Sequence, residues 1–165
     1  MKHCEPKTCL YGSETVRKDH PQIMLRGELD SLLADAVYTL ALARERGERE
    51  AENDLKDIVG VIRQVMRAEA CAIAPTFDHI IGLTFDELRE YSYHPQKYLH
   101  TEHVFPDENS DLICAVLNIL RTKVRQAERV CIAAGLDAYA NESIQMILNR
   151  LSSAVYIIML KHNMK

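Results

Sequence analysis

Prolines, paired cysteines and long apolar runs are all scarce in this chain of 165 residues, and each shortage restricts the range of possible folds. Five prolines leave two long proline-free segments, 22–74 and 107–165, in which long helices are expected. The five cysteines include no Cys-x-x-Cys pair and do not indicate a disulfide framework, so Cys114 and Cys131 are expected to be small buried residues. Neither useful strand-like alternation nor an internal repeat is visible.

Long apolar runs and excess positive charge are also missing. The longest purely apolar run, Ala154–Leu160, is far too short to span a bilayer, and segment 1–6 has no apolar secretory region. We therefore expect a cytoplasmic protein without a membrane partner. A net charge of −4 argues against a nucleic-acid binder with an overall basic surface, although it permits a local cationic pocket. Any phosphate-bearing partner is thus expected to be small.

What the sequence does contain is helical periodicity, which predicts an all-α fold, a five-helix bundle. We expect residues 1–14 to form an N-terminal tail and residues 15–165 to form a single helical-bundle domain. The five helices are expected at about residues 21–46, 50–73, 85–93, 111–134 and 141–161.

Helix boundaries are marked by local signals. Asp19 or His20 can cap the first helix, Thr84 opens a capping-box pattern, and Gly135 can end the fourth helix. The remainder of segment 74–110 is expected to be irregular. The apolar stripe predicted for the first helix consists of Leu25, Leu29, Leu32, Leu33, Ala36, Val37 and Leu40.

The segment Leu120–Arg129 places several cations inside a pattern that otherwise belongs to a core helix. At helical spacing, Arg121, Arg125 and Glu128 share one face, while apolar residues occupy another. Because a guanidinium cannot lose its charge, a row of them on a packed helix needs carboxylate or phosphate partners. The face is interpreted either as a polyanion site or as a solvated face with ion pairs along the helix.

Other polar residues also interrupt apolar helical patterns. Asp30 lies two turns into the first predicted helix, where it needs a cationic partner; an ordinary surface pair with Arg26 is the simpler alternative. The last predicted helix carries a polar stripe that indicates either hydrogen bonds to another helix or a ligand. That stripe consists of Asn149, Ser152, Ser153 and Tyr156.

Two N-terminal features suggest binding chemistry. The basic segment Tyr11–Pro21 leads into a helix N-terminus and can hold phosphates with backbone N–H groups and Lys18, although it lacks the Walker spacing. His3, Cys4 and Cys9 are candidate ligands for Zn²⁺ or Fe²⁺. They are one donor short of a closed tetrahedral site, so a tail that binds no metal is the alternative.

The histidine-rich segment in the predicted loop consists of His94, His100 and His103, where solvated side chains are the default interpretation. A di-iron centre would need Glu-x-x-His on two helices, and this spacing does not occur in the sequence.

Taken together, these segments resemble the cobalamin adenosyltransferases: the propanediol-utilisation (PduO) type broadly, and the ethanolamine-utilisation (EutT) type most closely. The resemblance covers about residues 15–160 and rests on the ordered blocks Lys18–Pro21, Arg26–Asp30, Met66–Ala70, Leu120–Arg125 and Leu148–Ser153. It implies a five-helix bundle that forms homotrimers, with ATP and the corrinoid at subunit interfaces. The sequence leaves a dimer as an alternative.

The resemblance implies an ATP:cob(I)alamin adenosyltransferase, which makes adenosylcobalamin and releases triphosphate. Such chemistry neutralises charge on the leaving group and holds the nucleophile in line, without a general base. Mg²⁺, a cobalamin reductase and an adenosylcobalamin-dependent enzyme of ethanolamine or diol degradation are implied partners. The rival interpretation is a non-catalytic bundle that binds a nucleotide or corrinoid as a sensor or carrier.

The resemblance also implies residue roles. Asp30 is expected to pair with Arg121 of a neighbouring subunit, and Arg125 to contact the triphosphate. Lys18 is expected on the ATP phosphates, and Asn149 with Glu128 around the nucleotide. The full set of implied cofactor-binding residues is Lys18, Arg26, Glu128, Asn149 and His103.

Three departures from the family pattern stand out. Cys9–Ser13 replaces the Thr-rich and Gly-rich phosphate loop of the PduO type. Of the His and Cys-Cys-x-x-Cys metal motif of the EutT type, only His3, Cys4 and Cys9 lie near the corresponding region. His103 stands three residues before Pro106, where the PduO type has a Phe that shields the lower face of the corrin, so an imidazole there is expected to shield or ligate cobalt.

Overall fold

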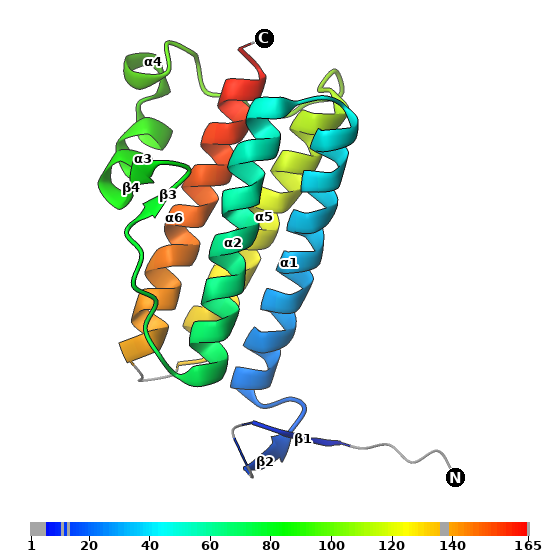
Figure 1. Ribbon diagram of the computed structural model, residues 1–165, viewed down its shortest axis with the longest axis vertical. Coiled ribbons are helices and arrows are strands. Elements are labelled where there is room, and N and C mark those ends of the chain that lie inside the picture. Colours follow the sequence, from blue (N-terminus) through cyan, green and yellow to red (C-terminus); the bar gives the residue numbers. More distant parts are fainter. Residues whose placement is uncertain (1–5, 11, 13, 136–138, 165) are drawn as a thin grey trace.

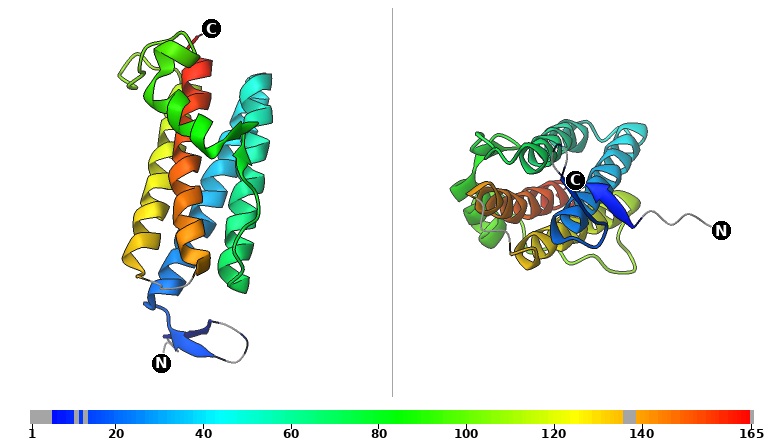
Figure 2. Two further views of the ribbon diagram at one scale, coloured as in Figure 1. Left: turned by 90° about the vertical axis from the view of Figure 1, so that its left-hand side faces the viewer. Right: turned by 90° about the horizontal axis from the view of Figure 1, so that it is seen from below.

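The computed structural model describes residues 6–10, 12, 14–135 and 139–164. Four long helices run side by side (Figure 1): α1 Pro21–Glu45, α2 Arg49–Cys71, α5 Leu112–Ala133 and α6 Tyr139–His162. α1 packs against α2 and α5, and α6 packs against the same two helices, so the four enclose one core. The shorter α3, Phe85–Tyr93, packs on the outside of α6 and leads into α4, Pro95–Tyr98 (Figure 2).

The predicted helix ends agree with the structure to within about two residues, and the predicted N-terminal caps of α1 and α3 are confirmed, whereas α5 ends at a C-cap of Ala134, one residue before Gly135. His20 caps α1, because its Nδ1 accepts a hydrogen bond from the Gln22 N–H at 3.2 Å. Thr84 and Glu87 form the complete capping box at the start of α3. Asp111 caps α5, and each such cap contributes about 1 kcal/mol to stability.

The buried face of α1 differs in part from the predicted stripe. Leu25, Leu29, Leu32 and Ala36 are fully buried, as expected, but Val37 is 43% exposed. The inward face continues instead through Thr39 and Ala43. Steps of alternately four and three residues keep a helix facing the same neighbours along its whole length.

α6 is the most enclosed helix, since α2, α3 and α5 all pack against it. Its segment Glu142–His162 is long and apolar enough to cross a membrane by length and composition alone, but 61% of the apolar window is buried inside the bundle. Contact with three neighbouring helices therefore accounts for this composition.

Two short hairpins and the four-residue α4 lie outside the sequence prediction. β1, Lys7–Cys9, pairs with β2, Thr15–Arg17, below the lower end of the bundle (Figure 1). β3, His79–Ile80, pairs with β4, Leu83–Thr84, directly before α3. The first hairpin pairs a strand before the boundary expected between residues 14 and 15 with a strand after it.

Candidate functional site

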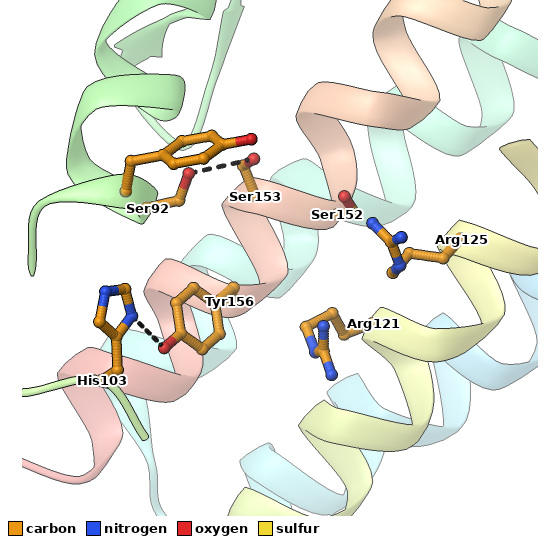
Figure 3. A pocket seen from close by; sticks show the side chains of 8 residues that line it. Ser92, His103, Arg121, Arg125, Ser152, Ser153 and Tyr156 are labelled. Carbon is orange, nitrogen blue, oxygen red and sulfur yellow. Dashed lines mark hydrogen bonds between the residues drawn. The ribbon is translucent and has the colours of Figure 1, made fainter. Parts of the chain in front are cut away.

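A cavity of about 260 Å³ opens between α3, α5, α6 and the segment that follows α4 (Figure 3). Its walls combine cationic, hydroxyl and aromatic side chains. The lining residues are Ser92, Tyr93, His103, Arg121, Arg125, Ser152, Ser153 and Tyr156.

Arg121 and Arg125 provide the positive charge of the cavity. Arg121 donates to Asn118 Oδ1 from Nε at 3.2 Å and from Nη2 at 3.0 Å, and its Cζ lies 5.9 Å from the centre of the Tyr156 ring. Arg125 is exposed and makes no hydrogen bond or ion pair with any described residue. No carboxylate occurs among the described lining residues. Two guanidinium charges without a carboxylate among the described lining residues favour anionic partners from outside this chain: a ligand, or a carboxylate of another copy.

Tyr156 connects the cavity to the segment between α4 and α5. Its hydroxyl oxygen accepts the Val104 N–H at 3.2 Å and lies 3.0 Å from His103 Nδ1. Burial raises the pKa of the Tyr156 phenol, although Arg121 and the Val104 N–H oppose the shift. The phenol therefore stays protonated at neutral pH, so its O–H can donate to His103 Nδ1 and hold the imidazole at the rim of the cavity.

The polar stripe on α6 forms hydrogen bonds to other segments, which is the first of its two interpretations. Ser92 Oγ lies 3.3 Å from Ser153 Oγ and links α3 to α6, while Ser152 donates to the Asn149 carbonyl at 2.8 Å. The same serines also line the cavity. The stripe thus joins helices, and its serine hydroxyl groups also face the cavity.

Glu128 and Asn149, which the resemblance placed together around the nucleotide, contact each other below the cavity. Asn149 Nδ2 donates to Glu128 Oε1 at 2.8 Å, and Arg150 Nη1 donates to Asn149 Oδ1 at 2.9 Å. The network ties α5 to α6 about one helical turn beyond Arg125. Glu128 and Asn149 are not among the described residues that line the cavity.

Three of the expected site residues lie on other parts of the bundle. Lys18 is exposed just after β2, and Asp30 is exposed on α1 without a partner among the described residues. Arg26 binds Glu69 at 2.9 Å, so the simple pair of Arg26 with Asp30 is wrong. In this chain, neither Lys18 nor Asp30 lines the cavity.

The described residues form no metal site of their own. His3 and Cys4 lie outside the described residues, and Cys9 is exposed, with its thiol 2.8 Å from the Gly12 carbonyl oxygen. No group of three or more His, Cys, Asp or Glu side chains in the described part of the chain could hold a metal ion.

Sequence reasoning missed Ser92 and Tyr93, which come from α3. The capping box identified that helix, but α3 is too short for its periodicity to show which face packs on α6. The available signal was their place in the last turn of a helix that directly precedes a histidine-rich segment.

Fold and cavity together define an all-α bundle with a cationic, hydroxyl-lined cavity. The chain belongs to the family described as cobalamin adenosyltransferase, which it matches over residues 5–162.

Two curated relatives are named corrinoid adenosyltransferase EutT. The one from Salmonella typhimurium is 33% identical over 164 residues, which is 97% of this chain and 60% of the relative. The one from Escherichia coli is 33% identical over 157 residues, or 93% of this chain and 57% of the relative. This chain therefore spans about three fifths of the length of these relatives.

A similar fold occurs in a solved structure, a variant of the PduO-type ATP:corrinoid adenosyltransferase from Lactobacillus reuteri complexed with cobalamin and ATP. The TM-score is 0.76, with 19% identity, and the match covers 97% of this chain and 90% of that one. The likeness confirms the all-α fold expected from the sequence.

Proposed function

We propose that this protein is an ATP:corrinoid adenosyltransferase. The cobalt(I) of a reduced corrinoid uses its electron pair to form a bond to C5′ of ATP, and the C5′–O bond breaks with its electron pair moving to the triphosphate. The observation that carries this proposal is the pair Arg121 and Arg125, which face one cavity without a carboxylate among its described lining residues. The relatives' names support the same reaction.

In this reaction the protein's main task is charge neutralisation and alignment. Negative charge grows on the leaving triphosphate, and Arg125 can bind two of its oxygens with one planar guanidinium. Arg121 is held by Asn118 and by the Tyr156 ring, so its charge is already oriented before the substrate arrives. The serine hydroxyls add hydrogen bonds, and no general base is needed.

We further propose that Mg²⁺ accompanies the triphosphate. No described carboxylate cluster forms a metal cage, so the phosphate oxygens and water would supply its ligands. The ion would contribute positive charge to the leaving group, alongside Arg125 and a Lys18 brought in from a neighbouring subunit.

The assembly and its setting are part of the proposal. We place ATP and the corrinoid at the interfaces of a cytoplasmic homotrimer, because Lys18 and Asp30 do not line the cavity of their own subunit. Reduced corrinoid would come from a cobalamin reductase, and the product would pass to an adenosylcobalamin-dependent enzyme of ethanolamine or diol degradation.

The decisive experiment is formation of adenosylcobalamin from ATP and chemically reduced cobalamin. We expect stoichiometric triphosphate and a product with a light-sensitive cobalt–carbon bond. Tight binding of ATP or cobalamin with no turnover would instead support a non-catalytic sensor or carrier. The cysteine-containing segment that replaces the phosphate loop is the feature that favours this rival.

We predict that His103 shields the lower face of the corrin. His103→Phe should then keep or raise activity, whereas His103→Ala should admit water to cobalt, hinder its reduction and lower activity about tenfold. Tyr156→Phe should have a similar but smaller effect, because it removes the hydroxyl that holds the imidazole. The exposed His94, which does not line the cavity, provides the control variant His94→Ala.

Cobalt ligation by His103 is the competing possibility, and it has its own signature. A corrinoid without a nitrogenous lower ligand, bound as cobalt(II), would show nitrogen hyperfine splitting in its electron paramagnetic resonance spectrum. Splitting that disappears in His103→Ala would contradict shielding. Equal activity in the three His103 proteins would show that the segment has no such role.

We predict that His3, Cys4 and Cys9 are not needed for the fold, because the core lies downstream. The combined change His3→Ala, Cys4→Ser, Cys9→Ser should shift the melting temperature by less than about 2 °C, as should Cys71→Ser at an exposed control cysteine. Elemental analysis of protein purified without oxidation measures the metal. Stoichiometric zinc or iron whose removal unfolds the bundle would contradict the prediction.

A further inference from the structure

Glu69, near the end of α2, is a buried carboxylate that the proposed reaction does not use. Its residue is only 2% exposed. It accepts hydrogen bonds from Gln22 Nε2 at 2.7 Å and from Arg26 Nε and Nη2 at 2.9 and 3.1 Å. A buried charge needs such pairing, because its desolvation is otherwise too costly.

Arg26 also binds the N-terminal hairpin, residues 6–18. Its third nitrogen, Nη1, donates to the carbonyl oxygen of Leu10 at 3.3 Å, between β1 and β2. A guanidinium is planar, so the two bonds to Glu69 fix the direction in which Nη1 points. Glu69 therefore acts on the hairpin through Arg26.

Beyond this bond, the described residues of the hairpin show little that holds it on the bundle. None of its described residues is buried, so apolar packing contributes little to its position. Its own base is closed by the hydrogen bond from the Lys18 N–H to the Pro6 carbonyl at 2.9 Å. The hairpin therefore behaves as a unit, and moving Leu10 moves Lys18 with it.

We propose that Glu69 is a positioning residue for the ATP site. Together with Gln22 and Arg26 it holds the hairpin against the bundle, an attachment that we call the latch, and so sets the position of Lys18 relative to the ATP phosphates. The part of this inference that concerns ATP rests on the proposed function. The latch itself rests only on the contacts of Glu69, Arg26 and Leu10.

The test uses Glu69→Gln, which keeps the size of the side chain but replaces the charged two-oxygen acceptor. Trypsin cleavage of the native full chain after Arg17 or Lys18 should become about tenfold faster, because the undocked hairpin samples cleavable conformations more often. The KM for ATP should rise about tenfold, while kcat and the KM for cobalamin change less than about twofold.

Asp54→Asn is the matched control. It removes another interhelical ion pair of α2, with Lys161 at 3.1 Å, at the opposite end of the bundle. It should lower the melting temperature without changing hairpin cleavage or the KM for ATP.

Arg26→Lys is the second variant. It retains a positive charge beside Glu69 but loses the planar guanidinium that reaches Leu10, so the hairpin is released with less loss of stability.

The proposal would be overturned if Glu69→Gln and Arg26→Lys had the same rate of hairpin cleavage and the same KM for ATP as Asp54→Asn. Faster cleavage with an unchanged KM would overturn it too, because the latch would then not position Lys18. A wild-type protein that forms no adenosylcobalamin would contradict the proposed function instead. Cleavage is measured without any reaction, so it decides whether the latch exists in either case.

Discussion

Arg125→Ala should lower kcat/KM for ATP by about 10² to 10³, because it removes a charged donor from the group on which negative charge develops. Arg125→Lys should still lose about tenfold, since a lysine keeps the charge but cannot bind two phosphate oxygens in one plane. Steady-state kinetics with chemically reduced cobalamin measures both. The large effect is expected because Arg125 has no described partner in the protein, so its full charge is available to a ligand.

Arg129 provides the matched control for Arg125. It lies one turn further along α5, is exposed, and does not line the cavity. Arg129→Ala should change kcat/KM by less than about twofold. If Arg125→Lys had unchanged kinetics and Arg125→Ala bound ATP normally, Arg125 would not be a triphosphate-binding residue.

Asp30→Ala and Arg121→Ala should each lower activity about tenfold to a hundredfold, since each leaves the other charge of an interface pair uncompensated. The double variant should be little worse than either single variant, because both changes remove the same interaction. Within one subunit, Arg121 binds Asn118, and Asp30 has no described partner. The pair is therefore expected between subunits.

Mixed oligomers distinguish a pair between subunits from one within a subunit. Co-expressed Asp30→Ala and Arg121→Ala chains should recover about a quarter of wild-type activity, because a random interface receives both intact residues in about one case in four. The control is co-expression of two differently tagged copies of the double variant, which has no intact pair to recover. Mixtures that stay as inactive as the single variants, or single-variant effects that simply add, would show that the pairing is wrong.

The four long helices, and the caps of α1, α3 and α5, follow from the sequence because the interactions that form them are local. His20, Thr84 and Asp111 each bind a backbone N–H two or three residues away, so their effect is visible in a short stretch of sequence. The common face of Arg121 and Arg125 is equally local, since helical spacing alone brings it about. The strands of both hairpins span only two or three residues each, too few for alternation to be recognised.

The partners of the polar side chains were decided by packing. Arg26 could have paired with Asp30 one turn away, but the approach of α2 to α1 brings it the buried Glu69, 43 positions along the chain. Ser92 and His103 likewise reach the cavity only because α3 and the segment after α4 lie against α6. The sequence by itself thus determined the helices, their ends and the cationic face of α5. Tertiary structure decided which charges meet and what surrounds them, because those contacts join residues whose separation along the chain carries no periodic signal.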